Sequence, residues 1–544
     1  MLQPSLMMDR PLLISDVIEH AAAQFGDVEI ASRETHGPMF RYTYAQCAAR
    51  ACKLAHALRR LGLTAGHAVA TLAWNNHRHL ETYYGVSGSG MVIHTCNPRL
   101  HPEQLIYILN HAEDRLMFFD RTFAALVERI APHCPKIRAF ICLSEAANVP
   151  ALAGVEGVLC YEDWIAPHPE EFDWPRFDER TGAAICYTSG TTGHPKGALY
   201  SHRAIVLNSL ASCLPGVLSL SARDAILPAV PMFHVNGWCI PYAAPIGGAK
   251  LVLPGQRLDG ASLYELMEAE GITVSAGVPT IWLGLMNHLE QGGLRFSTLQ
   301  RLLVGGSAMP VALIAKFADG YGVEVRHGWG MTETVAVATM GCLSARQMNL
   351  PAGARHAISA KHGKSVFGVE IKVVDEDGAT LPRDGISQGE LMVRGQWVIE
   401  RYYKCDATAL TDGWFPTGDI ATIDAHGTVQ IRDRAKDLIK TGGEWISSID
   451  VENAAIGHPA VAMAAVIGVR HPRWEERPLL LIVRKPEHNL EREEILAFLS
   501  QQIVKWWVPD EVIFLESLPV GGTGKVQKAA LRERYGSIFI LGGE

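Results

Sequence analysis

Several signatures of particular protein classes are missing from the sequence. None of the eleven cysteines forms a Cys-x-x-Cys pair, which excludes zinc and dithiol redox sites with that spacing. A membrane span needs about 18 consecutive apolar residues, and no stretch of the sequence is that long. The N-terminus becomes polar too early for a secretory signal. Long basic runs are also missing, and 49 Lys and Arg against 57 Asp and Glu give a net charge of −8. We therefore expect a soluble, cytoplasmic protein with reduced, mostly buried cysteines and no nucleic-acid partner.

Charged residues are scarce at 19%, whereas hydrophobic residues make up 48% of the 544 residues. The 51 glycines and 29 prolines are spread along the chain. This composition is typical of compact proteins with many turns and excludes disordered and collagen-like chains. The length is enough for roughly three to four domains of ordinary size.

The pattern of apolar residues predicts an α/β fold. Amphipathic helical patterns alternate with short apolar runs, such as residues 68–74 and 299–306, which are typical of buried, largely parallel strands. From about residue 365, alternating apolar and polar residues predict a small antiparallel β unit. The composition changes again at residues 432–440. We therefore expect a large N-terminal domain of parallel sheets with flanking helices and the small β unit, residues 1–435, and a small, mobile α+β C-terminal domain, residues 436–544.

The segment Tyr187–Gly197, YTSGTTGHPKG, has the composition of a loop that binds a polyphosphate. It follows an apolar run and combines three glycines with hydroxyl side chains and one lysine, so it offers many N–H, O–H and ammonium donors. An exposed linker is the alternative, but a lysine after a proline between two buried elements is not typical of linkers. The candidate ligands are Thr188, Ser189, Gly190, Thr191, Thr192, Gly193 and Lys196.

Two partial motif matches do not fit their structural requirements. A Walker P-loop needs Gly-Lys-Ser/Thr, but Lys196 follows Pro195 and Lys525 is followed by Val526. The residues around Ser387 match the Gly-x-Ser-x-Gly nucleophile elbow, but a polar turn precedes them and a strand pattern follows. We therefore exclude a P-loop kinase and expect Ser387 to be a turn residue.

Five further segments complete a set of motifs in a fixed order. They are PMFHVNGW (231–238), GWGMTE (328–333), TGD (417–419), DRAKDLIKTGGEWIS (433–447) and GGTGKVQK (521–528). With these motifs the chain resembles, over essentially its whole length, the acyl-CoA synthetase branch of the adenylate-forming enzymes. The segments VPMFHVNGWCIPYAAP and KTGGEWISSIDVEN are most similar to those of medium- and long-chain fatty acyl-CoA ligases.

The resemblance implies a two-step reaction. A carboxylate attacks the α-phosphorus of ATP to give acyl-AMP and pyrophosphate, and the thiol of coenzyme A then displaces AMP to give acyl-CoA. Because both reactants of the first step are anionic, the enzyme must supply positive charge. By motif match, Lys525 contacts the carboxylate and the α-phosphate, Thr332 binds the α-phosphate and His234 belongs to the substrate gate. Glu333 is the expected Mg²⁺ ligand, with Thr188 as a second ligand.

The resemblance also assigns the nucleotide site. Trp329 offers a flat face to adenine, Asp419 accepts hydrogen bonds from the ribose hydroxyls, and Arg434 is the partner of Asp419. Read without the family, Trp329 could be core packing, and Glu333 could be a helix N-terminal residue capped by Thr332. The remaining residues expected at the nucleotide are Ser307, Ala308, Met309, Gly328, Gly330 and Met331.

Residues near the second change of composition are expected to serve the thioester step. Lys436 matches the hinge about which the C-terminal domain swings between the two half-reactions. The residues expected to face coenzyme A are Lys440, Gly442, Gly443 and Trp445. Similar long-chain ligases are homodimers that exchange N-terminal segments, so we expect a homodimer.

The acid is expected to meet Val235, Gly237, Trp238 and Gly306. Their surroundings are mostly apolar and supply no counter-charge for a second substrate charge, which favours an apolar monocarboxylate over an amino acid. His234 and its neighbours could also simply be core residues. Three alternatives stay open: a ligase for a short acid such as methylthiopropionate, an acyl-AMP ligase that loads a carrier protein, and a non-catalytic nucleotide-binding regulator.

Overall fold

The computed structural model describes residues 5–35, 37–188, 194–442, 444–486, 488–521 and 525–541. The chain divides into two compact units, which are described separately. Unit 1 consists of Met1–Leu258, Thr332–Ala336 and Arg401–Thr408. Unit 2 consists of Asp259–Met331, Val337–Glu400 and Ala409–Glu544.

A mainly parallel sheet of seven described strands forms one core of unit 1. Its order is β7-β6-β5-β3-β4-β8-β9, and only β8 and β9 are antiparallel neighbours. The central strands are buried along their whole length, as expected for parallel strands covered by helices. The bounds are β3 (Ala68–Leu72), β4 (Val92–Thr95), β5 (Leu116–Phe119), β6 (Phe140–Cys142), β7 (Leu159–Cys160), β8 (Gly182–Tyr187) and β9 (Gly197–Ser201).

A second group of strands in unit 1 has the order β10-β11-β1-β2, with β2 antiparallel to β1. These strands are β1 (Glu29–Ser32), β2 (Phe40–Thr43), β10 (Ala225–Pro228) and β11 (Lys250–Leu253). The helices of the unit are α1 (Ile14–Gln24), α2 (Tyr44–Arg60), α3 (His77–Gly88), α4 (Pro102–Ala112), α5 (Ala124–Ile130), α6 (Tyr161–Ile165), α7 (His202–Cys213) and α8 (Ile240–Gly247).

Unit 2 begins with parallel strands and continues with an antiparallel sheet. Strands β12, β13 and β14 are parallel neighbours, and β15 and β16 extend them in antiparallel fashion. The antiparallel sheet has the order β17-β18-β19-β20, which confirms the β unit expected from about residue 365. The strands are β12 (Val274–Gly277), β13 (Arg301–Val304), β14 (Glu324–Trp329), β15 (Thr339–Met340), β16 (Lys364–Ser365), β17 (Val369–Val374), β18 (Gly389–Gly395), β19 (Phe415–Ile423) and β20 (Val429–Arg434). The helices of this part are α9 (Gly260–Glu270), α10 (Pro279–Gly292), α11 (Val311–Ala315), α12 (Ala345–Met348) and α13 (Ala352–Ser359).

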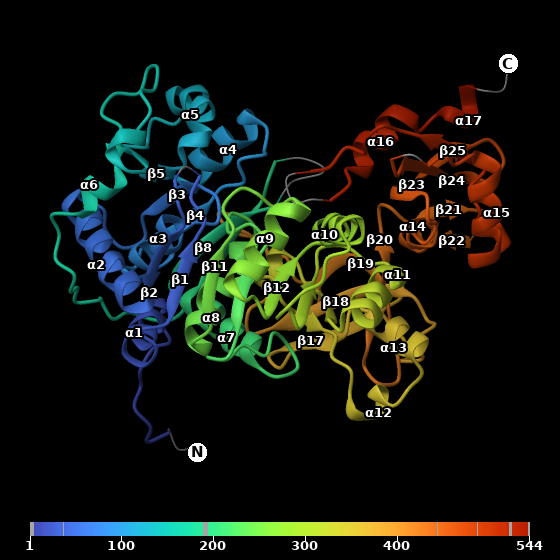
Figure 1. Cartoon of the computed structure of the whole chain (residues 1–544), viewed down its shortest axis with the longest axis horizontal. Coiled ribbons are helices and arrows are strands. Elements are labelled where there is room, and N and C mark those ends of the chain that lie inside the picture. Colours follow the sequence, from blue (N-terminus) through green and yellow to red (C-terminus); the bar gives the residue numbers. More distant parts are fainter. Residues whose placement is uncertain are drawn as a thin grey trace. The chain divides into compact units, whose positions relative to one another are not determined.

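The C-terminal sheet of unit 2, orange to red in Figure 1, has a hydrophobic core on each face. Leu480 and Ile482 of β24 pack with residues of α14 and α15, whereas Leu479 and Leu481 pack with Leu531 of α16. Successive side chains of a strand point to opposite faces, so β24 supplies both cores. The bounds are β21 (Ile439–Thr441), β22 (Glu444–Ile446), β23 (Val461–His471), β24 (Glu475–Arg484), β25 (Glu511–Phe514), α14 (Ser448–Ile456), α15 (Arg492–Gln502), α16 (Lys528–Tyr535) and α17 (Ile538–Leu541).

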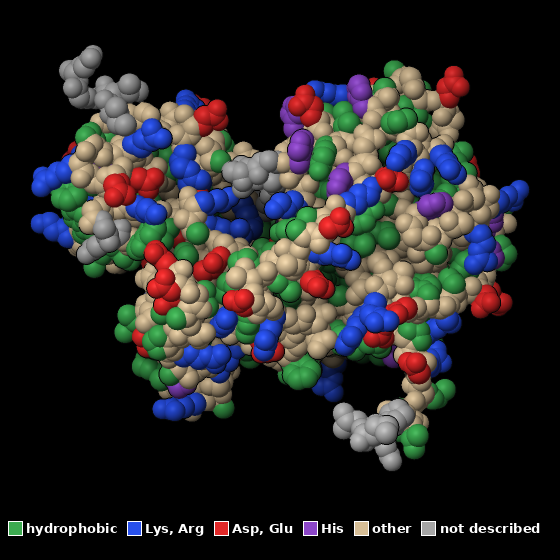
Figure 2. Space-filling model, turned by 180° about the vertical axis from the view of Figure 1, so that it is seen from behind, with side chains coloured by type: hydrophobic (Ala, Val, Ile, Leu, Met, Phe, Trp, Pro, Cys, Tyr) green, Lys and Arg blue, Asp and Glu red, His purple; other side chains and the backbone are tan. Residues whose placement is uncertain are grey.

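The surface carries charges of both signs. Figure 2 shows one face on which Lys and Arg side chains are interspersed with Asp and Glu side chains, in keeping with 49 basic against 57 acidic residues. All eleven cysteines lie among the described residues, and seven of them are buried, which confirms that most are buried. Among the helices of the described part, none is long and apolar enough to cross a membrane.

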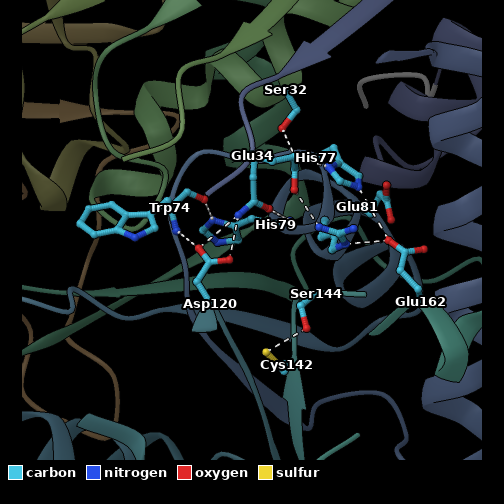
Figure 3. A network of polar contacts seen from close by, with 12 residues as sticks. Ser32, Glu34, Trp74, His77, His79, Glu81, Asp120, Cys142, Ser144 and Glu162 are labelled. Atoms are coloured by element: carbon cyan, nitrogen blue, oxygen red, sulfur yellow. Dashed lines mark hydrogen bonds and ion pairs between the residues drawn. The ribbon is translucent and has the colours of Figure 1, made fainter. Parts of the chain in front are cut away.

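Helix α3 lies within unit 1 with all twelve residues buried, although several of them are charged or polar. Its charges are paired: Arg78 is 2.8 Å from Glu34 and 2.6 Å from Glu162, and Glu81 is 2.8 Å from Arg50. Figure 3 shows the acidic members of this network, Glu34, Glu81 and Glu162. Buried charges are tolerated where they are paired and hydrogen-bonded, which allows a polar helix to occupy a core position.

Asp120, directly after β5, is a second buried acid of this network (Figure 3). Its carboxylate accepts hydrogen bonds from the backbone N–H of Trp74 at 2.6 Å and from Nδ2 of Asn76 at 3.0 Å. Burial raises the pKa of Asp120 to about 7, and the two donors only partly offset this effect. The folded protein therefore holds a proton on Asp120 at pH values where the unfolded chain has released it.

This titration predicts a pH-dependent stability difference for Asp120→Asn. Between the unfolded pKa of about 4 and the folded pKa of about 7, the folded state binds more protons, so wild-type stability falls as pH rises through this window. The amide side chain of the variant does not titrate. We expect the free energy of unfolding of the variant to rise relative to wild type by about 1–3 kcal/mol from pH 5 to pH 8. Urea unfolding at both pH values measures this, and a pH-independent difference would contradict it.

Candidate active site

Asp419 is a buried carboxylate in β19, directly opposite Arg434 of β20. Its Oδ1 is 2.7 Å from Nε of Arg434, and its Oδ2 accepts a hydrogen bond of 2.7 Å from Nε1 of Trp329. Burial raises the pKa of Asp419, whereas Arg434, Trp329 and Lys525 act in the opposite direction. Each oxygen keeps a second lone pair, so Asp419 can accept hydrogen bonds from two neighbouring hydroxyls.

Trp329 ends β14 and is held at both its backbone and its side chain. Its backbone N–H donates to Oγ1 of Thr339 at 3.2 Å, and its indole N–H donates to Asp419. The sequence suggested only an aromatic face or core packing for Trp329. The structure adds a specific role, since the indole N–H of Trp329 is a hydrogen-bond donor to Asp419. No local sequence pattern indicates this contact, because Trp329 and Asp419 are 90 positions apart.

Lys525 lies beside Gly306, since a Cβ on Gly306 would be 3.4 Å from Cε of Lys525. Gly306 has a φ of +86°, a conformation that strains other residues. Burial and the charge of Arg434 lower the pKa of Lys525 to about 8, whereas Asp419 raises it. Unit 2 thus brings five of the expected site residues together: Gly306, Trp329, Asp419, Arg434 and Lys525.

The other residues expected at the nucleotide lie at or just after the carboxyl ends of two parallel strands. Val304 of β13 pairs with His327 of β14, so the segments after these strands begin at one edge of the sheet. His327 is buried, and its Nε2 is 3.2 Å from the carbonyl oxygen of Ser307. A Cβ on Gly328 would be only 2.6 Å from the carbonyl oxygen of Thr339. This edge carries Ser307, Ala308, Met309, Gly328, Gly330 and Met331.

Glu333 belongs to a second group of residues, in unit 1. It is 5% exposed, and its Oε1 accepts a hydrogen bond of 2.7 Å from the hydroxyl of Tyr402. Burial and the charge of Glu333 raise the pKa of Tyr402, so its phenol stays a donor. Nζ of Lys196 lies 4.8 Å from the centre of the Tyr402 ring. Thr332 and Glu333 sit in a turn of three residues, Thr332–Thr334, so Glu333 does not start a longer helix.

The described ends of the phosphate motif are joined to each other. The backbone N–H of Thr188 donates to the carbonyl of Lys196 at 2.9 Å, and the N–H of Lys196 donates to Oγ1 of Thr188 at 3.1 Å. The motif starts at the end of β8 and finishes at the start of β9, between two buried elements as expected. The expected ligands Ser189, Gly190, Thr191, Thr192 and Gly193 lie outside the described residues.

The segment after His234 has an unusual backbone. Five consecutive residues, Val235–Cys239, have φ values between +34° and +59°, a short left-handed turn. Left-handed backbone costs roughly 1–2 kcal/mol for each non-glycine residue, so the surrounding structure must hold it in place. The expected substrate residues Val235, Gly237 and Trp238 all lie in this turn.

A small pocket lies next to this turn in unit 1. His234 and Val235 form one side of it, and Tyr187 at the start of the phosphate motif lines it as well. Its wall mixes polar and apolar groups: Thr95, Asn97, Leu100, Ile108, Cys186 and Phe233. The pocket therefore lies between the gate segment and the start of the phosphate motif.

Aromatic and basic side chains gather in the C-terminal part of unit 2. The rings of Trp474 and Trp506 meet edge to face at 5.0 Å, and the guanidinium of Arg477 lies 4.6 Å from the Trp506 ring. A Cβ on Gly442 would be 3.1 Å from the Trp474 ring. Sequence reasoning missed Trp474 and Trp506, since they are far from any recognised motif.

Lys440 and Trp445 form a similar pair nearby in the chain. Nζ of Lys440 lies 4.6 Å from the Trp445 ring, and 41% of Trp445 is exposed. Lys436 is exposed between β20 and β21, where the antiparallel sheet gives way to the C-terminal sheet. Gly443 lies outside the described residues. Ser387 donates to Asp384 at 2.7 Å in an irregular segment before β18, which confirms that it is a turn residue.

Comparison with known proteins agrees with this geometry. Residues 18–403 match the family model described as AMP-binding enzyme, and residues 450–525 match the AMP-binding enzyme C-terminal domain. The chain is 49% identical to a 3-methylmercaptopropionyl-CoA ligase of Ruegeria pomeroyi, over 98% of this chain and 99% of that protein. It is 48% identical to a medium-chain-fatty-acid–CoA ligase of Ectopseudomonas oleovorans, over 98% of each. The crystal structure of the anthranilate CoA ligase AuaEII with anthranoyl-AMP superposes with a TM-score of 0.86 at 25% identity, over 97% of this chain and 98% of that one. The expected fold, a large domain of parallel sheets and a smaller α+β domain, is confirmed.

The position of Lys525 predicts an unusually reactive lysine. With a pKa of about 8, Lys525 is mostly protonated at pH 7 and becomes neutral as pH rises to 9. Competitive labelling with acetic anhydride, read by mass spectrometry, should give a reactivity midpoint near pH 8, with the exposed Lys505 as internal reference. Arg434→Gln removes a repelling charge, so the midpoint should move to higher pH. A midpoint that does not respond to this substitution would show that Arg434 does not act on Lys525.

Proposed function

The chain belongs to the AMP-binding enzyme family and is an adenylate-forming acid–thiol ligase, and we propose that its acid is an apolar monocarboxylate, in first place a medium- or long-chain fatty acid. Residues 229–242 around the gate contain no charged side chain besides His234. An ammonium group or a second carboxylate would lack a counter-charge there. A short acid such as 3-methylmercaptopropionate (methylthiopropionate) is the second candidate, because the relative with that name is as similar as the fatty-acid ligase, at 49% against 48%. Both acids belong to the same chemical class.

Lys525 is the residue on which the adenylation step mainly depends in this proposal. The single supporting observation is its place beside Gly306, within the charge field of Asp419 and Arg434. Two anions must approach each other when the carboxylate attacks the α-phosphate, and a protonated lysine there offsets the developing charge. Thr332 is proposed to bind the same phosphate, and Gly306 leaves room for the carboxylate because it has no side chain.

ATP is proposed to bind with its ribose at Asp419 and its adenine at Trp329. Trp329 and Glu333 are four positions apart in one motif, which supports a single ATP as their common ligand. Glu333 and Thr188 present a carboxylate and a hydroxyl, the hard oxygen donors that suit Mg²⁺ beside a phosphate chain. When bound, Mg²⁺ neutralises phosphate charge. Lys196 adds a further positive charge for the β- and γ-phosphates.

Coenzyme A is proposed to bind to the C-terminal part of unit 2. Its adenine would stack on Trp474 or Trp506, and its phosphates would pair with nearby basic groups such as Lys440. Gly442 packs against Trp474 and, because it has no side chain, leaves room for the pantetheine arm to pass. A carrier protein in place of coenzyme A is the alternative acceptor.

The change between the two half-reactions is proposed to be a swing about Lys436, with the domain boundary at residues 435 and 436. The exposed position of Lys436 between two sheets supports this, since a torsion change there disturbs no core. We also propose a cytoplasmic homodimer. Leu6, Met7 and Met8 are 94%, 79% and 84% exposed, so a partner subunit could cover apolar surface there.

Pyrophosphate release with different acids tests the proposed function. We expect release from ATP and Mg²⁺ to depend on a straight-chain apolar acid, and coenzyme A to be consumed in equal amount. The series runs from acetate to palmitate and includes 3-methylmercaptopropionate, with amino acids and dicarboxylates as controls. Release without consumption of coenzyme A would favour the carrier-protein ligase, and ATP binding without release would favour the non-catalytic regulator.

The coenzyme A site has its own test in Trp506→Ala. Loss of a stacking face should raise KM for coenzyme A about tenfold, since base–aromatic stacking contributes about 1–3 kcal/mol. Acid-dependent exchange of pyrophosphate into ATP needs no coenzyme A and should stay at the wild-type rate. Trp414→Ala is the matched control, because Trp414 also packs against two basic side chains, Lys372 at 4.8 Å and Arg394 at 4.3 Å. Equal effects of both substitutions would refute the assignment.

A further inference from the structure

Three consecutive residues, Tyr402, Tyr403 and Lys404, connect separate parts of unit 1. Tyr402 contacts the carboxylate of Glu333 with its hydroxyl and the ammonium of Lys196 with its ring. We infer that Tyr402 is a positioning residue that presents Glu333 to Mg²⁺ and Lys196 to the phosphates of ATP. This inference rests on the proposed function and assigns a task to a residue outside all six sequence motifs.

The backbone around Tyr402 is held on its C-terminal side. The N–H of Tyr403 donates to the carbonyl of Gly197 at 2.8 Å, so the tripeptide is tied to the last residue of the phosphate motif. Nζ of Lys404 donates to the carbonyl of His111 at 2.8 Å and to Glu113 at 2.7 Å. These contacts fix where the Tyr402 ring can lie.

The hydrogen bond from Tyr402 constrains how Glu333 can bind a metal ion. A carboxylate with one oxygen engaged cannot rotate freely, so its other oxygen keeps one direction. Glu333 is 5% exposed, which leaves water little opportunity to replace the phenol. Groups that orient a metal ligand in this way typically change metal affinity by about 10–100-fold when they are removed.

The ring of Tyr402 acts on a different partner. Lys196 has an exposed, flexible side chain, and the π-face of Tyr402, 4.8 Å from Nζ, limits its range before ATP arrives. One side chain therefore orients the two groups that bind the metal and the phosphates, through two chemically separable contacts. Substitutions can remove the hydroxyl alone or the hydroxyl and the ring together.

Tyr402→Phe keeps the ring and removes the donor to Glu333. We expect the Mg²⁺ concentration for half-maximal pyrophosphate release to rise about tenfold, with kcat at saturating Mg²⁺ within about twofold of wild type and KM for the acid unchanged. Tyr402→Leu should in addition raise KM for ATP at saturating Mg²⁺. Tyr403→Phe is the matched control, because it removes the phenolic oxygen of the neighbouring ring and keeps the backbone contact of residue 403. This variant should behave as wild type.

Calorimetric titration with ATP, without acid or coenzyme A, measures binding without turnover. It is carried out once in buffer with Mg²⁺ and once in buffer with EDTA. Wild type should bind ATP more tightly with Mg²⁺, and Tyr402→Phe should lose most of this gain while its affinity in EDTA stays the same. An unchanged gain in Tyr402→Phe would overturn the inference, whether or not Tyr402→Leu folds. Failure of the proposed function would appear differently, as wild-type protein that binds Mg²⁺ and ATP but releases no pyrophosphate with any acid.

Discussion

The buried carboxylate of Asp419 is the interaction on which the nucleotide side of the site depends. A carboxylate that is 2% exposed needs partners, and those partners come from β14, β20 and the segment around Lys525. Burial lowers the pKa of Lys525 most, and the same charges adjust it further, since Arg434 lowers it and Asp419 raises it. A change in any one of these side chains therefore alters the electrostatic environment of the others. The group is best understood as one electrostatic unit.

The polar core around α3 has a comparable role in unit 1. Its paired charges allow a helix with polar side chains to be buried. Tyr83 on that helix donates a hydrogen bond of 2.5 Å to the carbonyl of Met232, which lies in the gate segment two residues before His234. Asn75 also binds this region, accepting from the N–H of Met232 at 2.7 Å. The left-handed turn is held from within by Asn236, whose Nδ2 donates to Thr95 at 3.2 Å. The strain at Val235–Cys239 is thus maintained by side chains from the core, as expected where an unfavourable backbone is part of a functional site.

Most of the fold was predictable because its signals are local. Short apolar runs correspond to β3, β5, β12 and β13, and the alternating pattern after residue 365 corresponds to the sheet of β17–β20. The expectation for Glu333 as a helix N-terminal residue was incomplete, because the chain makes only a turn of three residues at Thr332–Thr334. A three-residue turn and the start of a helix have the same local sequence signal, and only packing distinguishes them.

The sequence alone determined the class of chemistry. The evidence for it is the composition of residues 187–197, the lysine at 525, the acids at 333 and 419, and the order and spacing of the motifs that contain them. The tertiary structure decided which of these groups interact. It paired Trp329 with Asp419 across 90 positions, placed Lys525 beside Gly306, and brought Tyr402 to Glu333 and Lys196. Such contacts join residues far apart in the chain, and neither periodicity nor motif spacing encodes them. The pKa values and orientations that follow from these contacts depend on burial, which exists only once the chain has folded.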